Sequence, residues 1–338
     1  MPDDHPVPAE LPEPPDDSLV GTPPRRPGSV RRTAHINMVW PDGRGTQLQL
    51  RGRARDLLTT ADRRPVVLAE ARMVVGVGPE RTIESVEVHP PRPGAEGLVG
   101  ARGGDRMRSV IDEAIPGERE SATPLHFLLD DVAGASLIAG FAWSQSHPDE
   151  FRSQPRPAAQ VRLLRRGRII CSGLRPGGYA ELKRERGDNL SHYLRRAGDI
   201  ETPDDSWGWH EIEPAPAVCL RRRRRVDVWR ENGELAVDAH FRDSLWDATG
   251  TELALHEYSL EVGLDPAHHT VTRIAARPRV LPFPECPWAA SHVSTLVGRR
   301  VDGFRTGVQE TLTELECCTH LNDMLRCLAE VGHLASAL

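Results

Sequence analysis

Residues 34–52 read Ala34-His-Ile-Asn-Met-Val-Trp-Pro-Asp-Gly-Arg-Gly-Thr-Gln-Leu-Gln-Leu-Arg-Gly52, and this stretch decides the fold. Apolar and polar residues alternate before and after the segment Pro41–Gly45, which is typical of half-buried strands. The segment itself consists largely of residues that favour turns. The stretch therefore predicts a β-hairpin, in which the two strands run antiparallel.

Strand patterns continue beyond the hairpin, and helical patterns follow only later. Residues 66–77 and 81–88 have strand-like composition. A helix is predicted over about 105–114, and a second is indicated by apolar residues at i, i+3, i+4 and i+7 through 125–132. Because no helix separates successive strands, parallel βαβ units are excluded. The pattern predicts an α+β fold in which an antiparallel β-meander precedes its helices.

The same succession returns later in the chain. Constant offsets of 187, then 188, then 198 residues relate identical residues in the same order: Leu48 and Leu235, Asp56 and Asp243, Gly76 and Gly263, Thr82 and Thr270, Leu98 and Leu296. Matches that stay collinear across a whole unit predict an internal duplication. We expect two related units, each a meander followed by C-terminal helices, packed as a pseudo-twofold pair like a homodimer fused into one chain.

The offsets and the composition divide the chain into four segments. Residues 1–28 are rich in proline and acidic residues and are expected to form a disordered or loosely draped tail. The first repeat unit covers 29–141, and the second covers 219–338. The segment 142–218 is loop-rich, with two tryptophans close together, and is expected to be either a lid or a plain connector.

Composition excludes several classes of function. The formal net charge of −6 does not favour a nucleic-acid binder. No apolar run is long enough for a membrane span, and no apolar signal core opens the chain, so we expect a cytoplasmic protein with reduced thiols. Lys183 is the only lysine, which disfavours Schiff-base and pyridoxal-phosphate mechanisms. None of the six cysteines forms a Cys-x-x-Cys pair, so a zinc ribbon is not indicated.

The cysteines and histidines that could take part in catalysis lie together in the second unit. The catalytic candidates are His256, Cys286, Cys318 and His320, whereas the first unit contains no cysteine. Cys318 and His320 open a predicted helix, where the helix N-terminus would lower a thiol pKa. Asp243 matches Asp56 of the unit without thiols, so we assign both to a structural Arg–Asp pair or a turn cap rather than to catalysis.

Three interpretations of this Cys/His group stay open. The first is a lyase or isomerase that transfers protons through His320, with Cys318 and Cys286 as polarising or nucleophilic partners and His256 as a second acid–base group. The second is a Cys2His2 metal site, with zinc as its ion, formed by the same four residues. The third is a binding or assembly protein in which these residues are core packing. No nucleotide cofactor is expected, and a homodimer is compatible with the pattern.

The substrate-binding candidates are aromatic side chains of the connecting segment and one arginine of the second unit. Trp207, Trp209 and Tyr193 could stack on an aromatic ligand, although they could equally anchor a loop. Arg223 lies in the run Arg221–Arg225, which could clamp a carboxylate or a phosphate or could form a solvated strand entry.

The second half of the chain resembles the bacterial family known as domain of unknown function 2889. The matching pieces are Arg223-Arg-Arg-Val-Asp-Val, His256-Glu-Tyr, Pro284-Glu-Cys-Pro-Trp-Ala and Cys318-Thr-His-Leu. The first half looks like the longer members, through Arg31-Arg-Thr-Ala-His-Ile, Gly100-Ala-Arg-Gly-Gly and Pro124-Leu-His-Phe-Leu-Leu. The resemblance carries no established reaction. Members are described beside catabolic and acyl-CoA genes, which is an association and leaves the function open. Our leading expectation is a catabolic enzyme that acts on an aromatic or acyl small molecule.

Overall fold

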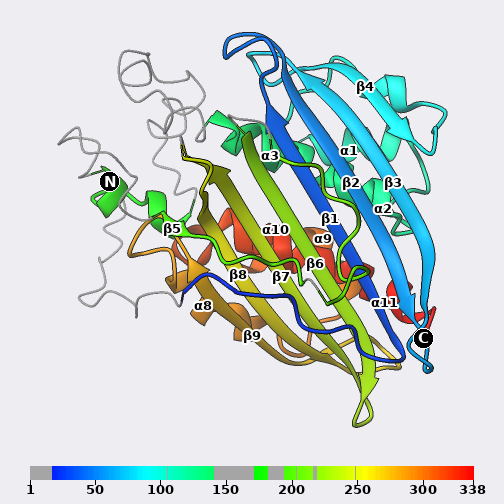
Figure 1. The fold of residues 1–338 in the computed structure, drawn as a ribbon. Helices are drawn as coiled ribbons and strands as arrows, with labels where there is room; N and C mark the ends of the chain where they lie inside the picture. Colours follow the sequence, from blue (N-terminus) through cyan, green and yellow to red (C-terminus); the bar gives the residue numbers. More distant parts are fainter. Residues whose placement is uncertain are drawn as a thin grey trace.

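The computed structural model of the chain describes residues 17–104, 106–140, 171–181, 194–202, 204–215, 219–247 and 249–338. The α+β class predicted from the sequence is confirmed, because a large antiparallel sheet is combined with several short helices (Figure 1).

Nine strands of the described chain form one antiparallel sheet. They are β1 (Ser29–Val39), β2 (Leu48–Thr59), β3 (Pro65–Val77), β4 (Ile83–His89), β5 (Arg195–Arg196), β6 (Cys219–Glu231), β7 (Glu234–Trp246), β8 (Glu252–Leu264) and β9 (Val271–Val280). The strand order is β4-β3-β2-β1-β6-β7-β8, and both β5 and β9 pair with β8. The predicted hairpin corresponds to β1 and β2.

The two meanders meet edge to edge in the middle of the sheet. Strands β1 and β6 pair along the full length of β1, from Ser29 opposite Trp229 to Val39 opposite Cys219. The sequence predicted each meander but not this joint. The pairing of β1 with β6 places both strands at the centre of the sheet, so neither meander has an unpaired edge where the two meet.

Helices cover one face of the sheet (Figure 1). Behind the first meander lie α1 (Met107–Ala114), α2 (Pro124–Asp130) and α3 (Val132–Ile138), and behind the second lie α8 (Trp288–Ser291), α9 (Phe304–Thr311), α10 (Thr319–Arg326) and α11 (Val331–Ala335). The helix predicted through 125–132 is divided at Asp131, whose carboxylate pairs with strand arginines. None of the described helices has the length and apolar character that crossing a lipid bilayer requires.

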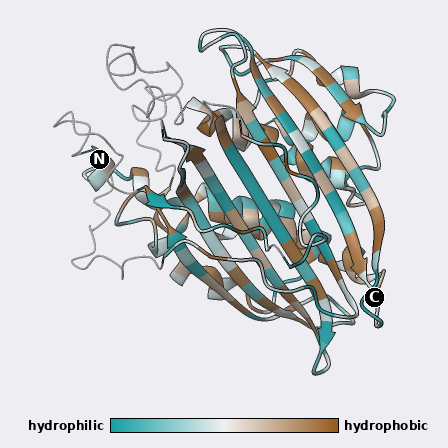
Figure 2. Cartoon of the chain, viewed as in Figure 1, coloured by the Kyte–Doolittle hydropathy of each residue, from teal (hydrophilic) through white to brown (hydrophobic). Residues whose placement is uncertain are grey.

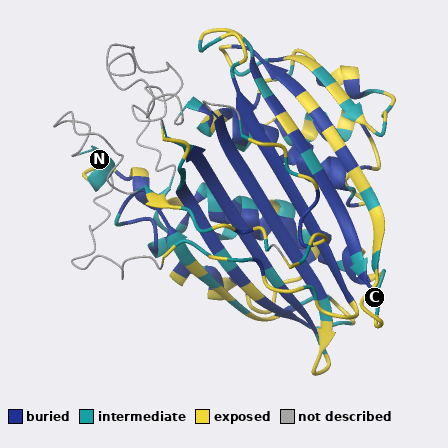
Figure 3. Ribbon diagram, viewed as in Figure 1, coloured by how far each residue is buried: buried dark blue, intermediate teal, exposed yellow. Residues whose placement is uncertain are grey.

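Two extended segments lie across the opposite face of the sheet (Figure 1). Residues 17–28 run beside residues 194–202, and the amide of Gly21 donates to the carbonyl of Asp199 at 2.7 Å. The Ser18 hydroxyl donates to the Glu257 carboxylate on β8, also at 2.7 Å. Because both faces are covered, all of β1 and most of β6 are buried (Figure 3).

Strand β6 is polar and nevertheless buried, as Figures 2 and 3 show together. Alternation sends Arg222 and Arg224 to the helix side and the other three arginines of Arg221–Arg225 to the opposite side. On the helix side, ion pairs join six arginines to six carboxylates; we call this the central charge network: Arg32, Arg108, Arg222, Arg224, Arg305, Arg326, Asp56, Asp130, Asp131, Asp243, Asp323 and Glu330. It is electrically balanced, as burial of so many charges requires.

Candidate active site

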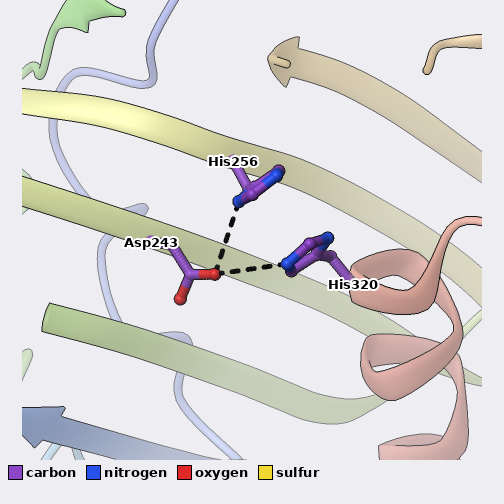
Figure 4. Close-up of side chains that lie close together, drawn as sticks. All are labelled: Asp243, His256 and His320. Atoms are coloured by element: carbon purple, nitrogen blue, oxygen red, sulfur yellow. Dashed lines mark ion pairs between the residues drawn. The ribbon is translucent and has the colours of Figure 1, made fainter. Parts of the chain in front are cut away.

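Two histidines and one carboxylate converge between the sheet and α10 (Figure 4). Asp243 of β7 lies opposite His256 of β8, and the pairing of these strands shifts by a β-bulge directly after Asp243. His320 reaches the same point from the first turn of α10. The Oδ2 atom of Asp243 is 3.6 Å from Nδ1 of His256 and 3.8 Å from Nε2 of His320.

The two imidazole rings stack on each other. Their centroids are 3.6 Å apart and their planes differ by 19°. Each ring turns one nitrogen towards Asp243, which leaves Nε2 of His256 and Nδ1 of His320 on the side away from the carboxylate. The His320 side chain is 19% exposed and is the most exposed of the three, ahead of His256 at 10% and Asp243 at 0%.

Helix α10 begins as the sequence predicts, at Thr319 with Cys318 as its N-cap residue. The backbone of Cys318 is extended, and its carbonyl accepts the amide of Asn322 at 2.8 Å. Leu321 and Leu325 are fully buried and fix the helix against the sheet. With that face anchored, His320 is held over β7 and β8.

Arg222 fixes the carboxylate of the cluster. Its Nε donates to Oδ1 of Asp243 at 2.9 Å, and its Nη2 donates to Oδ2 at 3.1 Å. Burial by itself would raise the pKa of Asp243, but the charge of Arg222 holds that pKa well below its ordinary value. The carboxylate is therefore ionised at neutral pH.

Both imidazoles are neutral at neutral pH. Burial lowers the pKa of His256, and this outweighs the opposite effect of Asp243. Burial also lowers the pKa of His320 well below its ordinary value, and His256 lowers it further. Because two stacked imidazolium ions would repel each other, protonation of one ring disfavours protonation of the other.

The candidate thiols lie beside the histidines in the apolar core of the second half. The Sγ atom of Cys318 is 4.0 Å from Nδ1 of His320, and Cys318 and Cys286 both belong to that core together with Tyr258. Burial raises the pKa of Cys318 and raises the pKa of Cys286 well above its ordinary value. Burial thus outweighs the lowering expected from the helix N-terminus.

Thiol titration tests this state of the cysteines. We expect Ellman's reagent at pH 8 to react with Cys286 and Cys318 in the native chain at least about tenfold more slowly than in the unfolded chain, because the thiolate is the reactive form. After unfolding in guanidinium chloride, all six cysteines should titrate. A rapid phase in the native protein that is absent from Cys318→Ser would contradict this expectation.

The predicted substrate-binding residues do not join this cluster. Arg223 is buried on the opposite face of the sheet, where it pairs with Glu252 at 2.6 Å. Trp209 is buried there and donates to the Thr22 hydroxyl at 2.8 Å, and the Trp207 carbonyl accepts from Arg55 at 2.7 Å. Trp209 and Trp207 thus hold the segment 204–215 on the sheet, away from the Asp243–His256–His320 cluster. Tyr193 lies outside the described residues.

The residues whose donor atoms lie close enough together to hold a metal ion differ from the predicted Cys2His2 set. Among the described residues, the donor atoms that lie within 4.8 Å of one another belong to Asp243, His256 and His320. This group contains Asp243 and neither Cys286 nor Cys318. The match of Asp243 to Asp56 indicates a structural role, and its position opposite His256 becomes apparent only from the strand register. Strand alternation alone cannot predict that register across a bulge.

Comparison with known proteins identifies one family. Residues 220–333 of the 338 match the model of a family described as "Protein of unknown function (DUF2889)". The matched range contains the whole Asp243–His256–His320 cluster as well as Cys286 and Cys318. Over this range the chain resembles that family. No curated protein and no solved structure matches the chain.

Proposed function

We propose that the chain is a small-molecule lyase or isomerase in which the Asp243–His256–His320 cluster transfers protons. One observation carries the proposal: two stacked imidazoles share a single buried carboxylate, and each keeps one nitrogen on the side away from it. A carboxylate behind an imidazole orients the ring and stabilises the imidazolium that forms when the ring accepts a proton.

His320 is the group that meets the substrate, because its side chain reaches solvent and Asp243 does not. When no metal ion is bound, a ring nitrogen of His320 removes a proton from the substrate. The ionised Asp243 stabilises the positive charge of the resulting imidazolium. The imidazolium of His320 then delivers this proton to another position of the substrate or to a leaving group. His256 either relays the proton after accepting it from His320 or orients the first ring. Taking up one proton and delivering it elsewhere suits a lyase or an isomerase.

The thiols and the substrate class follow from the surroundings. Cys318 lies next to Nδ1 of His320 and is proposed to polarise the substrate as a neutral thiol. Cys286 belongs to the apolar core next to the cluster, together with Tyr258 and Phe241. These apolar surroundings support an aromatic or acyl substrate.

Deuterium exchange tests this function even when the product of the reaction is not identified. The chain is incubated in D2O with aryl ketones, aryl-propanoyl thioesters and short acyl thioesters, and deuterium uptake next to the carbonyl is followed by mass spectrometry. We expect uptake into at least one probe class and a loss of about 10²-fold or more in His320→Gln. Uptake that is equal in the wild type, His320→Gln and His256→Gln would refute the proposal, as would no uptake at all.

We also propose that the two half-sheets arose by duplication and pack as a pseudo-twofold pair. The β-bulges after Asp56 and after Asp243 support it, because they lie 187 residues apart, as the sequence offset requires. Isolated bridges are equivalent as well: Thr82 with Arg102 and Thr270 with Arg300. In this scheme the first half keeps the Arg–Asp pair and lacks the stacked histidines.

A further inference from the structure

The donor atoms of the cluster enclose a gap that no hydrogen bond closes. The distances from Oδ2 of Asp243, 3.6 Å to His256 and 3.8 Å to His320, are too long for hydrogen bonds. Among the described residues, the buried Nδ1 atom of His256 has no hydrogen-bond partner. A buried polar atom without a partner calls for an explanation, and a bound ion between converging donor atoms is one.

We infer that Asp243, His256 and His320 bind one divalent transition-metal ion. Two imidazole nitrogens and one carboxylate oxygen are the ligands that zinc and iron(II) accept in sites that keep positions open for water or substrate. An ion held at about 2.0–2.2 Å by each ligand separates neighbouring ligand atoms by about 3–3.5 Å. The two distances from Oδ2 of Asp243 need to contract by only a few tenths of an ångström, and the stacked rings need to turn so that both nitrogen lone pairs point at the ion.

The residues around the cluster suit such an ion. Arg222 anchors both oxygens of Asp243 and leaves Oδ2 directed at the two rings, as an outer-shell group does for a metal-bound carboxylate. The Cys318 thiol lies near Nδ1 of His320, whereas Asp243 lies near Nε2 of the same ring. The thiol is therefore a neighbour of the ion and not one of its ligands. The exposed part of His320 leaves an approach for a further ligand.

This inference goes beyond the proposed reaction and does not depend on it. An ion bound to Nδ1 of His256 and Nε2 of His320 would also bind Asp243, so the same three residues form the site with or without the ion. The role of base would then pass from His320 to a water on the ion, whose pKa a metal lowers strongly.

Metal titration of the full chain tests the inference. The chelator-stripped protein is reconstituted with zinc or with cobalt(II), and metal content is measured by plasma mass spectrometry after removal of free ion. We expect about one ion per chain and a cobalt absorption spectrum without a sulfur charge-transfer band. His256→Gln and His320→Gln should each weaken zinc binding by at least about 10²-fold in competition with a chelator.

His126→Gln is the matched control. His126 is also buried beside a charged pair, with Nδ1 3.8 Å from Glu330, but the described residues place no second histidine against it. This variant should bind zinc as the wild type does. Far less than one ion per wild-type chain, undiminished binding in both ligand variants, or a sulfur charge-transfer band would overturn the inference. Deuterium exchange by the stripped protein is measured separately, so loss of the metal site and loss of the reaction are distinguishable.

Discussion

Replacing Arg222 with methionine is expected to lower the free energy of unfolding by about 3–5 kcal/mol. The guanidinium is 1% exposed and serves Asp243 at 2.9 Å and Asp131 at 3.2 Å. Methionine keeps much of the volume of the side chain and removes its charge. Two carboxylates then remain in the protein interior with weaker compensation, and an uncompensated buried charge costs far more than a lost surface pair.

Urea unfolding followed by circular dichroism measures this loss. Arg300→Met is the matched control, because Arg300 also pairs with a carboxylate, Asp302 at 2.5 Å, but both side chains are more than half exposed. Its unfolding midpoint should stay unchanged, since water and salt already screen that pair. Equal midpoints for Arg222→Met and the wild type would show that the central charge network does not stabilise the fold.

The central charge network explains how a sheet can be polar at its centre. Apolar side chains form one cluster behind each half-sheet, and the network lies where the two halves meet. Arg32 of β1 and Arg222 of β6 each hold the aspartate of the next strand outward, Asp56 and Asp243. Acids of the helices complete the pairing, so the helices are fixed to the sheet by charge as well as by apolar contact.

Alternation in the sequence predicts much of the fold because exposed and buried faces leave a period-two pattern. It locates β1, β2 and the helix at Thr319. It does not predict that β1 pairs with β6, because both strands are buried on two faces and arginines (Arg32, Arg222 and Arg224) interrupt the apolar positions of their helix side. The burial of β1 and β6 depends on helices and covering segments that are distant from these strands in the sequence.

The same limit applies to the candidate site. Local patterns identify His256 and His320, and the structure stacks their rings. The sequence indicates only a structural role for Asp243, because its proximity to His256 depends on the pairing of two strands. Residue type alone places Arg223 and Trp209 near a ligand, but strand direction and the path of the covering segment put them on the other face.

Asp243→Asn is expected to reduce the proposed activity by about 10²–10⁴-fold, whereas Asp56→Asn should leave it within about threefold of the wild type. The two aspartates are a matched pair. Asp56 accepts from Arg32 at 2.6 Å as Asp243 accepts from Arg222 at 2.9 Å, and both carboxylates are buried. Each change leaves its arginine with other acids, Glu330 for Arg32 and Asp131 for Arg222, so similar losses of stability are expected.

Only Asp243 lies against the stacked histidines, and this makes the comparison decisive. Asparagine at 243 keeps the shape of the side chain but loses the charge that stabilises an imidazolium or an ion. Deuterium uptake into the responsive probe is measured for both variants below their unfolding temperatures, with zinc content measured in parallel. If both variants lose activity equally, the carboxylate acts through stability alone. If Asp243→Asn loses activity while Asp56→Asn keeps it at equal stability, the charge of Asp243 acts in the reaction itself.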